Sequence, residues 1–258
     1  MSSEKSSDSK ASKSVLGRIG TFLFGEKDDL FSFETVKLVV SVVVIAVAIR
    51  SLAYEPFNIP SSSMKPTLLI GDYLFVSKLS YGYSRYSFPF GVVPLSGRVF
   101  EDAPERGDVA VFRKPTDPSV DFIKRVVGLP GDRIQVMAGV LHINGEPVKR
   151  RRIEDYLLNE NGRRPRPVAQ YLETLPNGVQ HRILETYGDN GFLDNTPEFV
   201  VPEGHFFMMG DNRDNSTDSR RPSVGYVPLT NYIGRAEIIF FSRDGWRIRF
   251  NRLFTLID

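Results

Sequence analysis

The chain has 258 residues, of which 41% are hydrophobic and 25% charged, and its formal net charge is +2. This length predicts one main globular domain with smaller additions, and so small a net charge gives no reason to expect a nucleic-acid partner. Because the sequence contains no cysteine, a disulfide framework, a thiol nucleophile and a cysteine metal site are excluded.

The N-terminal part leads into the most apolar segment of the chain. Residues 1–14 are rich in Ser and Lys, which predicts disorder, and the scattered apolar residues of 15–33 favour a short interfacial helix. Residues 36–54 are almost entirely apolar, and a bilayer span needs roughly 20 such residues. We therefore predict a cytoplasmic tail over 1–35 and one transmembrane helix over 36–54.

The residues around this segment support a membrane span. Lys37 and Arg50 lie near its ends, where they can reach the headgroups, and Tyr54 suits the interface. Basic residues are frequent before the segment, but after Arg50 the next one is Lys65, which places the N-terminus in the cytoplasm. Two alternatives are a buried core helix, disfavoured by the lack of a polar face, and a signal peptide cleaved near Ala53, disfavoured by Arg50.

Beyond Tyr54 the sequence predicts a mainly β fold. Residues 140–148 alternate apolar and polar side chains and contain an Asn-Gly pair, a strong hairpin signal. Residues 149–200 are charged and rich in Pro and Gly, as in an inserted cap of short strands and loops. The other predicted strands are β-branched or aromatic runs bounded by Gly or Pro, at 72–78, 108–112, 122–127, 205–209 and 235–241.

Two segments suggest nucleophilic chemistry. Residues 59–67 read Ile-Pro-Ser-Ser-Ser-Met-Lys-Pro-Thr, and a serine cluster between prolines suits a fixed turn that presents a hydroxyl. The residues alone do not distinguish Ser61, Ser62 and Ser63. Lys124 lies within the apolar run 122–127, where a charged amine is costly to bury unless it is paired or neutral. Serine with a neutral lysine is a known nucleophile–base pair of hydrolases.

Together with residues 210–220 (Gly-Asp-Asn-Arg-Asp-Asn-Ser-Thr-Asp-Ser-Arg), these segments resemble the bacterial type I signal peptidases, in the same order, over about residues 57–242. The resemblance implies a membrane-anchored serine endopeptidase that removes signal peptides from exported preproteins. It also implies an antiparallel β-sheet catalytic domain at 55–258, with a small β-rich cap at about 149–200 and one preceding transmembrane helix.

The resemblance also assigns roles to individual residues. Ser63 is the expected nucleophile and Lys124 the general base, and the Ser63 N–H with the Ser61 hydroxyl would form the oxyanion hole. Ser216 would hydrogen-bond the Lys124 amine. The family commonly has glycine at the position of Ser62. The positions that match the family's shallow apolar substrate pockets are Phe57, Ile59, Met64, Leu68, Val111, Phe122 and Ile123.

The proposed base requires a lowered pKa. An ordinary lysine has a pKa of about 10.4, and full burial lowers it by as much as roughly 3–5 units. The neighbouring Arg125 stays charged, so it cannot act as a base, and we expect it on the opposite face of the strand, paired with an acid. Asp218 and Arg220 are expected to form a structural ion pair that supports the 210–220 loop.

No cofactor or metal is predicted. A calcium-loop interpretation of residues 211–222 fails because its third, sixth and twelfth positions are Arg213, Ser216 and Pro222. The three histidines, which lie outside the motifs, are expected to be ordinary strand or loop residues. They are His142, His181 and His205.

The expected partners are exported preproteins, the lipid bilayer and, as a candidate, the protein-export translocon, with the catalytic domain on the outer side of the bacterial inner membrane. The main alternative is a non-enzymatic, membrane-anchored β domain that binds peptides. A self-cleaving repressor-type protease is a second alternative. Residues 81–95 are rich in aromatics, which favours either a hairpin with one buried face or a loop in the lipid interface.

Overall fold

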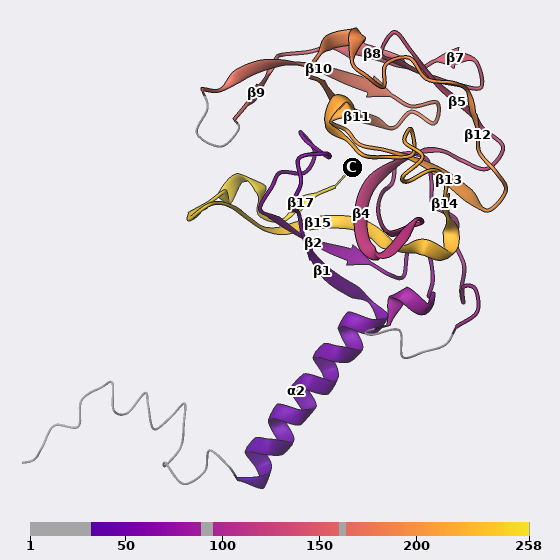
Figure 1. Ribbon diagram of the computed structural model, residues 1–258. Helices are drawn as coiled ribbons and strands as arrows, with labels where there is room; N and C mark the ends of the chain where they lie inside the picture. Colours follow the sequence, from indigo (N-terminus) through magenta and orange to yellow (C-terminus); the bar gives the residue numbers. More distant parts are fainter. Residues whose placement is uncertain (1–31, 89–94, 160–163, 258) are drawn as a thin grey trace, which may run out of the picture. The chain divides into compact units, whose positions relative to one another are not determined.

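The computed structural model describes residues 32–88, 95–159 and 164–257, and its contacts divide the chain into two units, Met1–Ala48 and Ile49–Asp258 (Figure 1). Helix α2 (Phe33–Leu52) begins after Ser32, whose Oγ accepts a hydrogen bond from the Thr35 backbone N–H at 3.3 Å. This is an ordinary N-cap, which satisfies one of the free N–H groups of the first turn. The apolar side chains of the helix are exposed along its length.

The apolar segment therefore forms a helix, but with different bounds from those predicted. The helix ends at Leu52, and Tyr54 already belongs to the first strand. Within residues 32–88, 95–159 and 164–257, no helix is both long and apolar enough to cross a membrane. The prediction of a transmembrane helix over 36–54 is thus not supported. Of the tail predicted over residues 1–35, residues 1–31 lie outside the described residues.

A nine-stranded sheet carries the main motifs. Its strands run in the order β1-β2-β15-β3-β4-β13-β14, every pairing is antiparallel, and β16 and β17 pair with β15. The strands are β1 (Tyr54–Asn58), β2 (Asp72–Ser77), β3 (Val109–Lys114), β4 (Asp117–Gly128), β13 (His205–Met209), β14 (Val227–Pro228), β15 (Tyr232–Asp244), β16 (Arg247–Ile248) and β17 (Thr255–Leu256).

Two four-stranded antiparallel sheets complete the domain (Figure 1). One contains β8 (Lys149–Arg152), β9 (Tyr156–Leu158), β10 (Arg166–Thr174) and β11 (Gln180–Glu185), all within the stretch predicted as a cap. The other contains β5 (Arg133–Met137), β6 (Val140–Ile143), β7 (Glu146–Pro147) and β12 (Phe199–Val200). Short 3-10 helices are η1 (Arg85–Ser87), η3 (Gly188–Asn190), η4 (Arg213–Asn215), η5 (Leu229–Asn231) and η6 (Phe250–Arg252).

The mainly antiparallel β architecture agrees with the prediction. Each run predicted as a strand overlaps one, and the Asn-Gly pair forms the predicted hairpin between β6 and β7. Asn144 and Gly145 have φ angles of 57° and 86°, the left-handed conformation that a two-residue hairpin turn of this kind requires.

A buried apolar cluster lies beneath the serine-rich turn. Ile59, Met64 and Leu68 pack there with residues of β2, β3, β4 and β15, and both Met64 and Leu68 have no exposed surface. Burying Met64 and Leu68 contributes about 1.5–3 kcal/mol each. Because Ile59 is buried before Ser63 and these two residues after it, the turn is fastened to the domain on both sides of Ser63.

The aromatic segment at 81–95 begins in the core. Tyr81 is 1% exposed, its ring lies edge-on to Tyr232 and its hydroxyl donates to Asp108 at 2.9 Å. The interfacial-loop hypothesis is therefore wrong for Tyr81. Residues 89–94 of the aromatic segment lie outside the described residues.

Candidate active site

The serine-rich turn is held in place by main-chain hydrogen bonds at both ends. Ile59 N donates to Asp72 O at 2.9 Å, and Leu68 N donates to Met64 O at 2.8 Å. At its centre, Ser63 O accepts the N–H of Asn212 at 3.0 Å. Met64 points into the core, and the Ser63 side chain is directed toward the strand that carries Lys124.

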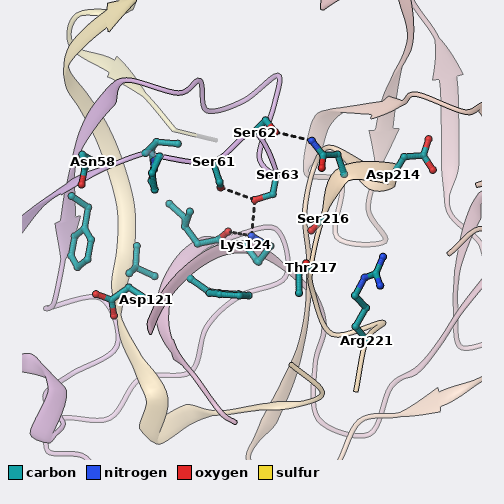
Figure 2. Close-up of a pocket in the computed structure, with 17 residues that line it drawn as sticks. Asn58, Ser61, Ser62, Ser63, Asp121, Lys124, Asp214, Ser216, Thr217 and Arg221 are labelled. Atoms are coloured by element: carbon teal, nitrogen blue, oxygen red, sulfur yellow. Dashed lines mark hydrogen bonds between the residues drawn. The ribbon is translucent and has the colours of Figure 1, made fainter. Parts of the chain in front are cut away.

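Strand β4 brings Lys124 to this serine. Lys124 pairs with Ala110 of β3, and it is only 4% exposed. Its Nζ lies 2.8 Å from Ser63 Oγ, and it also donates to Ile123 O at 2.7 Å (Figure 2). The two residues are 61 positions apart in the sequence, so the β-sheet topology creates this contact.

Burial makes Lys124 a usable base. It lowers the pKa of Lys124 from 10.5 to about 8, and the carboxylates of Asp218 and Asp211 limit the decrease. With a pKa of about 8, about one such lysine in ten is neutral at pH 7, compared with about one in a few thousand for an ordinary lysine. A neutral amine at hydrogen-bond distance from a serine hydroxyl can accept its proton.

The other two serines of the turn have separate contacts. Ser61 Oγ lies 3.2 Å from Ser63 Oγ, on the cavity side (Figure 2). Ser62 is held from the 210–220 loop, since Asn215 Nδ2 donates to its Oγ at 2.7 Å and Asn212 Nδ2 to its carbonyl at 3.1 Å. The Ser62 hydroxyl therefore ties the turn to the loop opposite.

A cavity of about 590 Å³ opens next to Ser63 and Lys124. Five of the seven predicted pocket residues line it, whereas Met64 and Leu68 lie in the core beneath the turn and do not. The lining residues are Phe57, Asn58, Ile59, Pro60, Ser61, Ser62, Ser63, Val111, Asp121, Phe122, Ile123, Lys124, Asp214, Asn215, Ser216, Thr217 and Arg221. The cavity therefore has an apolar side from β1, β3 and β4 and a polar side from the 210–220 loop.

Comparison with known proteins assigns this chain to a family. Residues 32–241 match the family described as signal peptidase, peptidase S26. A signal peptidase I of Rickettsia typhi is 47% identical over 208 residues, covering 78% of this chain and 77% of that protein. A signal peptidase I of Rickettsia prowazekii is 43% identical over 227 residues, covering 84% of both.

The chain belongs to the signal peptidase family. A solved signal peptidase I from Enterococcus faecalis is also similar, at 27% identity and a TM-score of 0.32, with 52% of this chain and 97% of that chain covered. Family membership makes the chain a peptidase. The alternatives of a non-enzymatic peptide-binding domain and of a repressor-type protease are therefore wrong.

The predicted hydrogen bond from Ser216 to Lys124 is not found among the described residues. Ser216 Oγ is buried and has no hydrogen-bond partner among the described residues. Gly210 packs against it, and a Cβ on Gly210 would lie 2.3 Å from Ser216 Oγ and 2.6 Å from Ser63 O. Glycine is thus needed here so that the loop can approach the turn, a requirement that the sequence analysis missed.

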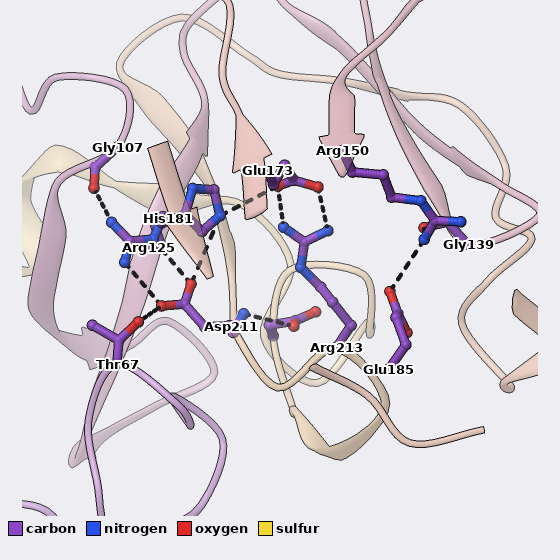
Figure 3. A network of polar contacts seen from close by, with 12 residues as sticks. Thr67, Gly107, Arg125, Gly139, Arg150, Glu173, His181, Glu185, Asp211 and Arg213 are labelled. Carbon is purple, nitrogen blue, oxygen red and sulfur yellow. Dashed lines mark hydrogen bonds and ion pairs between the residues drawn. The ribbon is translucent and has the colours of Figure 1, made fainter. Parts of the chain in front are cut away.

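Arg125 lies on the opposite side of β4 from Lys124, as predicted, and its partner is Asp211. Its Nε and Nη2 donate to the two Asp211 oxygens at 2.9 and 2.8 Å, and both side chains are 1% exposed. Thr67 also donates to Asp211, so this carboxylate joins the serine turn, the 210–220 loop and β4 (Figure 3). Burial alone would raise the pKa of Asp211, but the Arg125 charge outweighs it and holds the pKa below its ordinary value.

Further buried ion pairs continue this network (Figure 3). Arg213 donates to both carboxylate oxygens of Glu173, and Arg220 donates to both oxygens of Asp218, the predicted structural pair. His181, expected to be an ordinary strand residue, lies 3.2 Å from Glu173 and 4.0 Å from Asp211. Burial and the Arg125 charge lower the pKa of His181, so it is neutral near pH 7.

The site residues that were missed differ in the signals they offered. Asp211 and Asn212 lie inside the 210–220 motif, and their loop position alone could have suggested contacts with the serine turn. Glu173 and Arg213 come from β10 and η4 and carry no local signal, because only the packing of the cap sheet brings them together. Asp121 lines the cavity, exposed and 3.1 Å from Arg113, which the sequence did not indicate either.

Proposed function

We propose that this chain cleaves signal peptides from exported preproteins, with Ser63 as the nucleophile and Lys124 as the general base. The observation that carries the proposal is the 2.8 Å separation of Ser63 Oγ and Lys124 Nζ at a buried position beside an open cavity. A peptidase needs an activated nucleophile, a proton shuttle and a stabilised oxyanion. The Ser63–Lys124 pair supplies the first two.

The reaction follows acyl-transfer chemistry. Neutral Lys124 accepts the proton of the Ser63 hydroxyl as Oγ attacks the scissile carbonyl carbon, and the carbonyl oxygen becomes an oxyanion. The Ser63 backbone N–H and the Ser61 hydroxyl donate to this oxyanion. The Lys124 ammonium then gives its proton to the leaving amine, and an acyl-enzyme remains on Ser63. Water, deprotonated by the same amine, hydrolyses the ester and regenerates both groups.

The cavity supports recognition of small side chains in an extended substrate. Its apolar side is formed by Phe57, Ile59, Val111, Phe122 and Ile123, and we expect the space between these side chains to exclude larger residues. Strand β1 pairs only with β2 within the described residues, so its other edge is available to a peptide strand. Signal peptides end in a small-x-small site, which matches both features.

We further propose that the chain is anchored in the bacterial inner membrane, with the N-terminus in the cytoplasm and the catalytic domain outside, near the translocon. Support comes from the exposed apolar side chains along α2, which would be unfavourable in water, and from the basic residues that precede it. Alkaline extraction of membranes tests the attachment, and protease protection in spheroplasts tests the orientation. Release of the full chain by alkali would contradict the anchor.

Substitution of the turn serines tests the chemistry. In the purified full chain, Ser63→Ala is expected to lower kcat/KM for a preprotein at least about 10³-fold, because no other oxygen occupies its position. Lys124→Arg should have the same effect, since a guanidinium does not accept a proton.

Ser62→Ala is the matched control. It removes the neighbouring hydroxyl and the contact with Asn215, but no reacting atom, so we expect less than a tenfold loss. Circular dichroism on each variant checks that the fold is retained. Near-normal cleavage by Ser63→Ala, or equal losses in Ser62→Ala and Ser63→Ala, would contradict the assignment.

A further inference from the structure

A second polar cluster, outside the catalytic machinery, lies where β11 ends near the 210–220 loop. Glu185 closes β11, Asp194 follows η3, and Asp214 belongs to η4. One carboxylate oxygen from each lies within 4.8 Å of the other two. Glu185 and Asp194 are 2% and 1% exposed, and Asp214 is half-buried at the rim of the active-site cavity (Figure 2).

Local structure holds two of these carboxylates in place. Asp214 Oδ2 accepts the Tyr187 backbone N–H at 2.7 Å, and Asp194 Oδ2 accepts the Gly191 backbone N–H. A Cβ on Gly191 would lie 2.0 Å from Asp214 Oδ1 and 3.0 Å from Asp194 Oδ2. The absence of a side chain at Gly191 is therefore what allows these two like charges to approach.

Among the described residues, the arginines around this cluster form one long ion pair with it, between Arg150 and Glu185, and are otherwise bound elsewhere. Arg150 donates to Asp189 at 2.8 Å and to Gly139 O at 3.0 Å, and its nearest nitrogen is 3.9 Å from Glu185 Oε1 (Figure 3). Arg213 and Arg220 are bound by Glu173 and Asp218. Across the described residues, none of the three clustered carboxylates accepts a hydrogen bond from an Arg or Lys side chain.

Glu185 is the most exceptional member of the cluster. Its Oε2 is buried and lacks any hydrogen-bond partner among the described residues, although an unpaired buried carboxylate oxygen costs several kcal/mol in general. Burial, together with the nearby Asp214 and Asp194, raises the pKa of Glu185 to about 8. The cluster thus combines two neighbouring Asp carboxylates with a buried Glu185 oxygen that has no hydrogen-bond partner among the described residues, and a cation bound there would displace the Glu185 proton.

We propose that Glu185, Asp194 and Asp214 bind a calcium ion. All three ligands are carboxylate oxygens, which hard divalent cations prefer, and the cluster offers no histidine or thiolate for zinc. Calcium binds oxygens at about 2.3–2.6 Å, so ligand oxygens on opposite sides of the ion lie about 4.6–5.2 Å apart. The three carboxylate oxygens of the cluster lie within 4.8 Å of one another, which fits these distances. Magnesium, at about 2.0–2.1 Å, requires a tighter and more regular set of ligands.

The position of the ion gives it a structural role near the catalytic site. It would join the end of β11, the loop after η3, and η4, and the last residue of η4 is Asn215, which holds the Ser62 hydroxyl. Calcium would therefore stabilise the loop that forms the polar side of the cavity without touching Ser63 or Lys124.

Thermal unfolding of the full chain in detergent tests this site without relying on peptidase activity. After treatment with a chelator, added Ca²⁺ at a hundredfold excess over its Kd should raise the midpoint by roughly 5–10 °C, because a ligand that binds only the folded state stabilises it. Calorimetric titration of Ca²⁺ and of Mg²⁺ gives the affinity and the selectivity directly. We expect Glu185→Gln and Asp194→Asn to abolish the Ca²⁺ shift.

Glu146→Gln is the matched control, since Glu146 is an exposed acid in β7 away from the cluster, and it should keep the full shift. If Glu185→Gln does not fold, Asp194→Asn and the calorimetry on the unaltered chain still decide the matter. The absence of any Ca²⁺ shift up to millimolar concentration overturns the proposal, as does an equal shift in the unaltered chain and the Asp194→Asn variant. A midpoint that rises on acidification but not with Ca²⁺ would instead identify a protonated Glu185.

Discussion

Two adjacent residues of β4, Lys124 and Arg125, have buried basic side chains, but only Arg125 is bound directly by a carboxylate of the described residues. Arg125 is bound by both oxygens of Asp211 and by Gly107 O, so its charge is retained in the interior. Within the described residues, Lys124 Nζ donates hydrogen bonds to the Ser63 hydroxyl and the Ile123 carbonyl oxygen, and burial lowers the pKa of Lys124 to about 8. Alternation along one strand thus separates a structural charge from the amine that we propose as the general base.

The difference depends on how the nearby carboxylates are engaged. Asp211 and Asp218 are close enough to raise the pKa of Lys124, which would weaken it as a base at neutral pH. Each is bound by an arginine, Arg125 or Arg220, whose charge offsets its field. The ion pairs therefore stabilise the loop and also leave the lysine without a counterion of its own.

The structural side of this comparison is tested by Asp211→Asn. The substitution leaves Arg125 as a buried charge without its bidentate partner, which typically costs about 3–5 kcal/mol of folding free energy. Urea unfolding of the full chain measures the loss. Asp244→Asn is the control, because Asp244 is 71% exposed and 3.5 Å from Arg249, and exposed pairs contribute less than about 1 kcal/mol. Equal losses in the two variants would show that burial does not govern the Arg125 pair.

The reactive side predicts a change of the opposite sign. Below pH 8 the folded state carries Lys124 charged in a site where burial lowers its pKa from 10.5 to about 8. Lys124→Met removes this penalty, so the variant should be more stable at pH 7 by up to about 3 kcal/mol, and inactive. Because the folded pKa is the lower one, the unaltered chain gains stability between pH 8 and 10.5, and the difference should shrink over that range. A variant less stable than the unaltered chain at pH 7 would contradict this.

The sequence was sufficient for the parts of the site with a local signal. Lys124 stood out because it interrupts an apolar strand, and the Asn144–Gly145 hairpin was predictable from the turn conformation that these residues adopt. The placement of Met64 and Leu68 was wrong because the sequence does not reveal which way side chains of an irregular turn point; here they face the core. Only the strands have a fixed alternation that assigns faces.

The ion network could not be predicted for a different reason. Arg213 and Glu173 are 40 residues apart and meet because the cap sheet packs against the 210–220 loop. Several acids and arginines of similar local character compete for such pairings, and sequence spacing does not distinguish them. The same holds for Gly210, whose role follows from the approach of Ser63 O and Ser216 from elsewhere in the chain.

The smallest expected effect concerns the pH dependence and connects both sides of the comparison. If neutral Lys124 is the base, kcat/KM should rise with pH and level off above its pKa of about 8. Asp218→Asn removes a carboxylate that raises this pKa and leaves Arg220 unpaired, and both changes disfavour the ammonium form. The rising limb should therefore move to lower pH by up to about one unit, since a nearby charge commonly shifts a pKa by about 1–3 units. The profile is measured on the fraction of the variant that remains folded, and Asp244→Asn should leave it unchanged. If the rise of kcat/KM occurs at the same pH in the Asp218→Asn variant, or at a higher pH, a group other than Lys124 controls the pH dependence.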